Sequence, residues 1–127
     1  MSTRRSIVPL SPFEAEIGFT RALREGDRIL VSGTVAQSQD GVWPQDAGAQ
    51  ADSCFAQIIG YIEELGGRAE HVVRVRMFVT DIADADAVSA AFSRALKHAR
   101  PTGTLVAIAA LYRPEWKVEI EAEAIVP

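Results

Sequence analysis

The residues that decide the fold are Arg-Pro-Thr-Gly-Thr-Leu-Val-Ala-Ile-Ala-Ala-Leu, from Arg100 to Leu111. Pro101 ends a helical pattern, because its ring blocks the helical hydrogen bond and biases Arg100 away from helical backbone. Gly103 then allows a turn or the close approach of another group. The segment Thr104 to Ala110 is short, apolar and rich in branched residues, which predicts a buried strand. No ionisable side chain follows Arg100 in this stretch, so the start of the strand offers little chemistry of its own.

Length and composition indicate a single globular domain over residues 1–127. The chain is 48% hydrophobic and 24% charged, which is close to the average for folded proteins. Its net charge of -4 argues against a nucleic-acid-binding protein. No apolar run approaches the roughly 20 residues of a membrane span, and no apolar segment of a secretory signal follows Arg4 and Arg5. Cys54 is the one cysteine, so an intrachain disulfide is excluded. We therefore expect a cytoplasmic protein.

Periodicity on both sides of the deciding stretch predicts the order β-β-α-β-α-β-β. A helix follows from an apolar stripe of Ala51, Cys54, Phe55, Ile58, Ile62 and Leu65. Asp46 is the candidate cap of this helix, and Gly66-Gly67 its candidate end. A second helix is predicted from Asp84 to Ala99. The predicted strands are residues 17–23, 28–35, 71–81, 104–110 and 117–126, with residues 6–10 as a candidate edge strand.

Two helices cover only one face of a single sheet, so the other face needs a partner. In the strand over residues 71–81, Val73, Val75, Met77 and Val79 alternate with Arg74, Arg76, Phe78 and Thr80. The second set mixes an aromatic ring with charges, which are costly to bury unpaired. Burial against further copies of the chain, with arginines and glutamates paired, removes both difficulties. The sequence therefore predicts a homo-oligomer.

No motif for a metal or a bound cofactor is present. His71 and His98 are far apart and are expected at the surface, and Cys54 lies on the core stripe of a helix. The glycines have neither Walker nor dinucleotide spacing. We expect no metal and no cofactor.

Charged residues on the strands are the better candidates for a site. Glu119, Glu121 and Glu123 share one strand face, where they either form cross-strand pairs with Arg74 and Arg76 or place one carboxylate in a cleft. Arg21 and Arg76 each lie on a predicted strand, with an aromatic residue on the same face. They either bind a substrate carboxylate through two hydrogen bonds or form salt bridges between subunits.

The chain resembles the Rid superfamily, also called YjgF/YER057c/UK114, from about Ile17 to Val126. The matching segments are Val31-Ser32-Gly33, Leu65-Gly66-Gly67, Val72-Val73-Arg74 through Phe78-Val79-Thr80-Asp81, Pro101 through Ala109-Ala110-Leu111, and Val118-Glu119-Ile120-Glu121-Ala122. Their order and spacing are specific only when taken together. The segment Gly18-Phe19-Thr20-Arg21-Ala22 is similar to a less studied branch of the superfamily.

The resemblance implies a chorismate-mutase-like α+β fold, a mixed sheet with two helices on one face, and a homotrimer with small-molecule clefts between subunits. It also implies hydrolysis of reactive imines and enamines to ketoacids and ammonia, without metal or cofactor. Carried over residue by residue, Glu119 positions water, Phe19 replaces the usual tyrosine, Gly33 gives a close backbone contact, and Ser89 is the polar helix residue. Gly103 stands where the superfamily's arginine grips the substrate carboxylate.

Three hypotheses follow. In the first, the chain is a divergent deaminase-type hydrolase in which Glu119 positions water and Thr104 donates a hydrogen bond. Either Arg21 or Arg76 then replaces the missing arginine, or the ligand is a different, neutral one. In the second, the same cleft binds a small molecule without catalysis. The third is a ribonuclease of the endoribonuclease L-PSP kind, against which the acidic balance counts.

Overall fold

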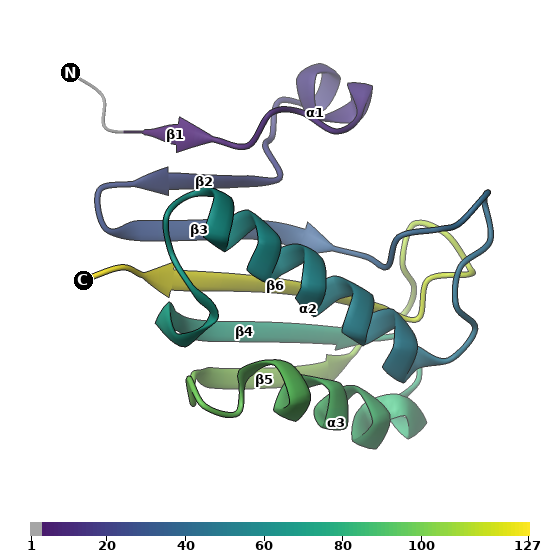
Figure 1. Cartoon of the computed structure of the whole chain (residues 1–127). Helices are drawn as coiled ribbons and strands as arrows, with labels where there is room; N and C mark the ends of the chain where they lie inside the picture. The colour runs from purple at the N-terminus through teal and green to yellow at the C-terminus, as the bar shows by residue number, and fades with distance from the viewer. Residues whose placement is uncertain (1–3) are drawn as a thin grey trace.

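The computed structural model describes residues 4–127 and contains one six-stranded mixed sheet (Figure 1). The strands lie in the order β1-β2-β3-β6-β4-β5, and β4 and β5 are parallel whereas the other neighbours are antiparallel. The strands are β1 (Arg5–Ser6), β2 (Ala22–Glu25), β3 (Arg28–Thr34), β4 (Val72–Val79), β5 (Thr102–Ala107) and β6 (Val118–Ile125). The helices are α1 (Pro12–Ile17), α2 (Ala47–Glu64) and α3 (Ala85–Leu96), with short 3-10 turns η1 (Ala69–His71) and η2 (Ile82–Asp84). This is the predicted α+β class.

Helix α2 has the predicted start and end. The Asp46 side chain accepts a hydrogen bond from the Gly48 amide at 3.2 Å, which satisfies one of the free N–H groups of the first turn. At the other end Gly66 has φ +89, and the Gly67 amide donates to the Ile62 carbonyl at 2.8 Å. This is the Schellman arrangement, in which a glycine adopts the left-handed conformation at low cost.

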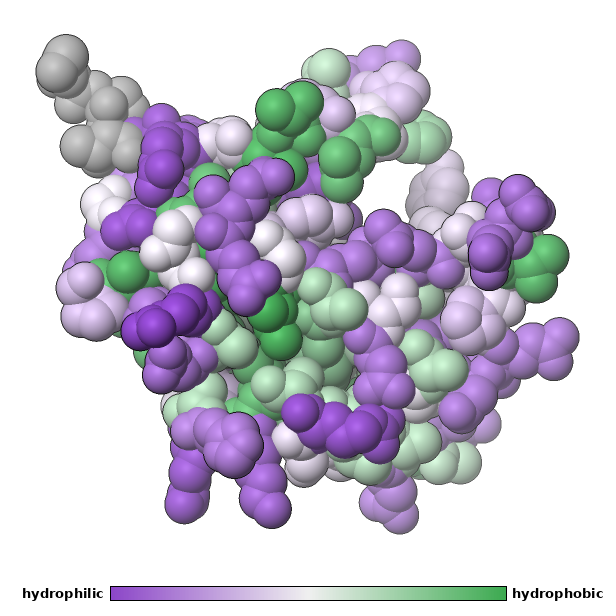
Figure 2. All heavy atoms as spheres, in the orientation of Figure 1, coloured by the Kyte–Doolittle hydropathy of each residue, from purple (hydrophilic) through white to green (hydrophobic). Residues whose placement is uncertain are grey.

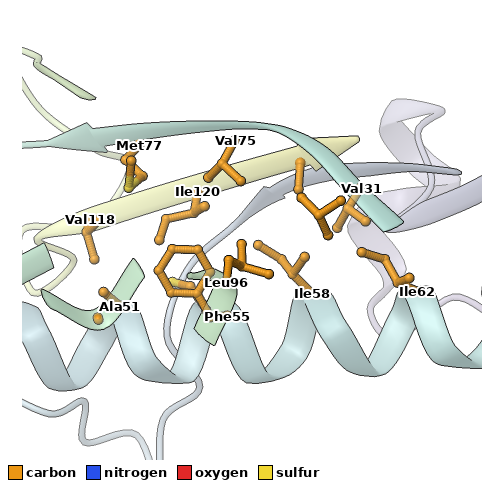
Figure 3. Packing of buried hydrophobic residues seen from close by; sticks show 14 of the residues in the cluster. Val31, Ala51, Phe55, Ile58, Ile62, Val75, Met77, Leu96, Val118 and Ile120 are labelled. Carbon is orange, nitrogen blue, oxygen red and sulfur yellow. The ribbon is translucent and has the colours of Figure 1, made fainter. Parts of the chain in front are cut away.

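The core lies between the sheet and helices α2 and α3, which cover the same sheet face (Figure 1). Figure 3 shows Phe55, Ile58 and Ile62 of α2 pointing toward Val31, Val75 and Ile120 of the strands. The Phe55 and Phe92 rings meet edge to face with centroids 6.0 Å apart, and so join α2 to α3. The predicted apolar face of β6, Val118, Ile120, Ala122 and Ala124, is buried in this core.

Helices α2 and α3 leave the opposite sheet face open, and this face carries cross-strand ion pairs. Arg76 Nε lies 2.8 Å from Glu121 Oε1, an ion contact without hydrogen-bond alignment. Arg28 Nη2 lies 3.0 Å from Glu123 Oε2, and Arg74 Nε lies 4.0 Å from the other oxygen of Glu123. The pairing alternative predicted for Glu121 and Glu123 is therefore confirmed. Within one chain this face carries an aromatic ring among charged side chains, as the sequence predicts.

The N-terminal segment differs from the prediction. The candidate edge strand was residues 6–10, but the strand found is Arg5–Ser6. Residues 12–17 form helix α1, and β2 begins at Ala22 and not at Ile17. Ser11 precedes the helix, Pro12 occupies its first position, and Gly18 ends it at φ +100. These are ordinary start and end signals of a helix, and in this short segment they outweigh the apolar alternation around Ile17.

Two strand predictions are also corrected. The β4–β6 register shifts between Val72 and Arg74, so Val72 faces the core and Val73 is 38% exposed, not buried beside Val75. Strand β5 runs from Thr102 to Ala107 instead of 104–110. It pairs only with β4 at the edge of the sheet, and within one chain most of its residues are exposed. Apolar content alone cannot distinguish an edge strand from a central one, which is why burial was predicted.

Candidate functional site

A cavity of about 460 Å³ opens where α1, the segment between α1 and β2, the strands β3 and β6, and the loop before β6 come together. Its lining combines aromatic and apolar side chains with three charged ones: Ser11, Phe13, Glu14, Ile17, Phe19, Arg21, Ser32, Gly33, Val35, Tyr112, Trp116 and Glu119. Figure 2 shows hydrophobic side chains gathered over the α1 region, beside a gap that separates it from the loops at the other end of the sheet. Four predicted site residues, Phe19, Arg21, Gly33 and Glu119, line this one cavity.

Glu119 lies in the cavity because β6 places it opposite Phe78 and not opposite an arginine. Its two neighbours on the same face, Glu121 and Glu123, pair with Arg76 and with Arg28 and Arg74. Burial raises the pKa of Glu119, the Arg21 charge opposes that rise, and the Glu121 charge adds to it. A carboxyl with a raised pKa takes up a proton more readily near neutral pH, which suits proton transfer.

Gly33 provides the space that the Glu119 carboxylate occupies. A Cβ atom built on Gly33 would lie 2.8 Å from Glu119 Oε1 and 2.9 Å from its Cδ, closer than real contacts allow. The register of β3 against β6 also shifts between Val31 and Thr34, next to this glycine. The glycine within a strand therefore marks a close approach, as its position in the sequence indicates.

Arg21 reaches the same cavity from the segment before β2. Its Nη2 donates to the Gly33 carbonyl at 2.7 Å, and its guanidinium lies 5.5 Å from the centre of the Phe19 ring. Its Nε is buried without a hydrogen-bond partner. Arg21 is thus a cation held in the same cavity as Glu119, and its Nε–H has no hydrogen-bond partner.

The other lining residues, Glu14, Tyr112 and Trp116 among them, were not predicted from the sequence. Glu14 of α1 is only 2% exposed, and its Oε2 accepts hydrogen bonds from the Leu10 and Ser11 amides at 2.8 and 2.9 Å. The Ser11-x-x-Glu14 spacing of a capping box is the signal that points to this glutamate. Trp116 and Tyr112 come from the loop before β6, and no sequence pattern distinguishes them.

The other four predicted site residues lie elsewhere in the chain. Thr104 of β5 is in register with Arg76 of β4, so the whole of β4 separates it from β6 and Glu119, roughly 10 Å at usual strand spacing. Arg76 is paired with Glu121 outside the cavity. Ser89 is exposed on α3, and the side-chain direction of Gly103 points toward the Phe92 ring at 4.0 Å. One chain does not bring these residues to Glu119.

Cys54 and the histidines do not form a site. The Cys54 thiol is buried and donates to the Thr34 carbonyl at 3.2 Å, and burial raises its pKa to about 12, which makes it an unreactive core residue. The Arg68 amide donates to His71 Nδ1 at 3.0 Å. Across residues 4–127, no three His, Cys, Asp or Glu side chains gather as metal ligands would. None of the helices in this part of the chain has the length and apolar character needed to cross a bilayer.

Comparison with known proteins gives the family. The family model described as Endoribonuclease L-PSP matches residues 10–126. "Uncharacterized protein SCO2049" of Streptomyces coelicolor is 33% identical over 115 residues, which cover 90% of this chain and 86% of that protein. RutC family protein PM1466 of Pasteurella multocida is 30% identical over 117 residues, which cover 87% of this chain and 90% of that one.

Solved structures agree with the sequence relatives. Rv2704 of Mycobacterium tuberculosis, described as a member of the YjgF/YER057c/UK114 family, superposes with a TM-score of 0.89 at 32% identity and covers 98% of this chain and 100% of its own. PA3499 of Pseudomonas aeruginosa superposes with a TM-score of 0.86 at 29% identity, covering 99% of this chain and 94% of its own. The order of elements, the mixed sheet and these matches agree, and the chain belongs to the YjgF/YER057c/UK114 family, the Rid superfamily, with its chorismate-mutase-like fold.

Proposed function

We propose that this protein hydrolyses a small, reactive imine or enamine to a carbonyl compound and ammonia, with Glu119 positioning the attacking water. The observation that carries the proposal is the unpaired state of Glu119. It is the glutamate of its strand face that lines a cavity and lies opposite Phe78 and not opposite an arginine of β4, and its pKa is raised by burial. The family match makes this reaction class the natural candidate.

The reaction needs one general base and a modest polarising group. Glu119 takes a proton from water as the oxygen attacks the carbon of the protonated imine, which forms a neutral carbinolamine. The protonated carboxyl then returns that proton to nitrogen, and the C–N bond breaks as the hydroxyl becomes a carbonyl. The remaining proton leaves with ammonia as ammonium. Arg21, within the same cavity, stabilises the ionised form of Glu119, which is present before the attack of water and again after the proton has passed to nitrogen.

The proposed assembly is a homotrimer with the site at its subunit boundaries. The uncovered sheet face carries Leu30, Phe78 and Val106 among its charged pairs, and Phe13 and Tyr112 are exposed at the cavity. These apolar groups favour burial against a second copy. The role proposed for Thr104 as a hydrogen-bond donor depends on this assembly, since its own chain keeps it away from Glu119.

The test compares imine hydrolysis by the wild type, Glu119→Gln and the matched control Glu123→Gln, which lies on the same strand face but pairs with Arg28. Substrates are 2-iminobutanoate and a carboxylate-free imine, each generated in the assay. We expect Glu119→Gln to lose most of the acceleration over buffer, about a hundredfold or more, whereas Glu123→Gln retains it. Equal rates for wild type and Glu119→Gln would refute the assignment.

A second candidate function is binding of a small molecule without turnover. Gly103 favours it, because this position has no side chain to hold a substrate carboxylate in the orientation that hydrolysis needs. A ligand-dependent rise in melting temperature without imine hydrolysis would support this function, since ligand binding to the native state stabilises it. We expect no RNA cleavage in an assay with the wild type, because a net charge of -4 disfavours the binding of a polyanion.

A further inference from the structure

The cavity contains buried polar atoms that nothing in the chain satisfies. Glu14 Oε1, Arg21 Nε and Trp116 Nε1 are each enclosed and have no hydrogen-bond partner, and all three residues line this cavity. Buried polar groups in folded proteins almost always have partners, because leaving one unpaired is costly. Three such atoms around one cavity indicate a ligand that supplies the partners.

Glu14 is the unusual member of this set. It is 2% exposed, and only its Oε2 accepts hydrogen bonds, from the Leu10 and Ser11 amides and, at 3.5 Å, from the Ser11 hydroxyl. None of the ion pairs found among residues 5–127 includes Glu14. A buried carboxylate normally has a cationic or hydrogen-bonding partner on each oxygen. The free Oε1 therefore calls for an N–H donor, and a charged donor best.

The charges around the cavity favour a cation over an anion. Two carboxylates, Glu14 and Glu119, and one guanidinium line the cavity, and Arg21 already donates to the Gly33 carbonyl. A ligand carboxylate would meet two like charges and a partly occupied cation. Gly103 adds no compensating charge, because it has no side chain and its Cβ direction faces the Phe92 ring.

The remaining lining suits an apolar body. Phe13, Ile17, Phe19, Val35 and Trp116 provide aliphatic and aromatic surface, and a cation close to aromatic faces gains a further attraction. We infer that the cavity takes a small, apolar molecule with a protonated nitrogen and no carboxylate, such as an alkyl or aryl iminium ion or the matching primary amine, and that Glu14 binds this nitrogen. This deepens the proposed function and rests on it: the imine hydrolysed would derive from an amine, not from an amino acid.

The test uses three ring compounds of similar size and different charge: benzylamine, benzyl alcohol and benzoate. Titration calorimetry at neutral pH with the full chain should give benzylammonium at least about tenfold tighter binding than benzoate, with benzyl alcohol between them. Glu14→Gln should weaken benzylammonium binding about tenfold or more, because the charged hydrogen bond is lost, and should leave benzyl alcohol unchanged. The glutamine carbonyl still accepts from the Leu10 and Ser11 amides, so α1 is expected to form. Glu16→Gln, an exposed position on the same helix, is the matched control and should change nothing.

A second measurement on the wild type keeps the test independent of the folding of the variant. The indole N–H of Trp116 has no partner, whereas that of Trp43 donates to the Ala36 carbonyl at 3.1 Å. In a nitrogen-15 NMR titration, benzylammonium should move the Trp116 signal more than the Trp43 signal. Equal or tighter binding of benzoate, or a Glu14→Gln variant that binds benzylammonium like the wild type, would overturn the inference.

The two proposals fail differently. Glu119-dependent hydrolysis of 2-iminobutanoate, together with a preference for benzoate, would refute the cation site and leave imine hydrolysis standing. Selective benzylammonium binding without any imine hydrolysis would keep the cation site and refute the enzyme.

Discussion

Substitution of Gly33 by alanine should separate the stability of this protein from its activity. The backbone of Gly33 has no left-handed conformation, so alanine fits the β3 strand without backbone strain. The new Cβ would lie 2.8 Å from Glu119 Oε1, against an ordinary contact distance of 3.4 Å or more. The carboxylate must therefore move by about 0.6 Å, the difference between these two distances. Because the clash is with the flexible end of a side chain, movement costs little folding energy.

Catalysis is far more sensitive to this displacement than folding is. A glycine within a strand costs roughly 0.5–1 kcal/mol relative to alanine, so the gain from alanine should offset the cost of the shift and leave the free energy of unfolding within about 1 kcal/mol of the wild type. A catalytic group misplaced by about 1 Å can lose about a hundredfold in rate, so a shift of this size should lower kcat/KM for imine hydrolysis by about ten- to a hundredfold.

The assay pairs urea unfolding with steady-state imine hydrolysis. Gly60→Ala is the matched control, because no atom lies within 4 Å of its added Cβ and its position is an exposed one on α2. It should raise stability by roughly 0.5–1 kcal/mol and leave kcat/KM unchanged. A Gly33→Ala variant with full activity would refute the argument that this glycine holds Glu119 in place. So would a loss of several kcal/mol in stability, since it would show that the backbone and not the carboxylate had moved.

The remaining predictions concern charge, packing and assembly. Arg21→Met removes the charge that lowers the pKa of Glu119, so the acid limb of the pH–rate profile should move to higher pH; an unmoved limb contradicts the assignment of the base. Because the folded-state pKa of Glu119 is raised, its protonated form favours folding at low pH and this contribution is lost as the pH rises through that pKa. Glu119→Gln should therefore raise the melting temperature at pH 7 more than at pH 4, and an equal effect at both would exclude the burial argument. Phe55→Ala, at a fully buried position against Phe92, should lower the free energy of unfolding by about 3–5 kcal/mol in urea titrations, and a loss below 1 kcal/mol would contradict the packing described. Phe78→Glu adds a charge beside Glu119 on the uncovered sheet face, so native mass spectrometry should show single chains for this variant and the proposed trimers for the wild type; equal trimer formation by both would remove this face from the interface.

Much of the fold could be predicted from local patterns. The cap at Asp46 and the glycine end at Gly66 were predicted for α2 because both depend on residues adjacent in the sequence. Helix α1 was missed even though Ser11, Pro12 and Glu14 form a standard start, since six residues give too little periodicity to recognise. The bulge at Val73 was missed as well, because a register shift is decided by the partner strand and not by the strand itself.

The candidate site divides in the same way. Glu119, Arg21, Phe19 and Gly33 were predicted candidates and share one cavity, whereas Thr104, Ser89 and Gly103 lie apart from it within the chain. No pattern linked Trp116 to Glu119, because these residues belong to a loop and a strand that meet only after the chain has folded.

By itself, the sequence determined the class of fold, the buried stripe of α2, the alternation of β6 and the family, because periodicity and turn chemistry act between near neighbours. Only the tertiary structure decided which of three equivalent glutamates faces a cavity. Glu121 and Glu123 pair with arginines of neighbouring strands. Glu119 lies opposite Phe78, and its carboxylate occupies the space that the missing side chain of Gly33 leaves. Register between strands distant in the sequence sets those neighbours, and the surroundings of a carboxylate set its chemistry.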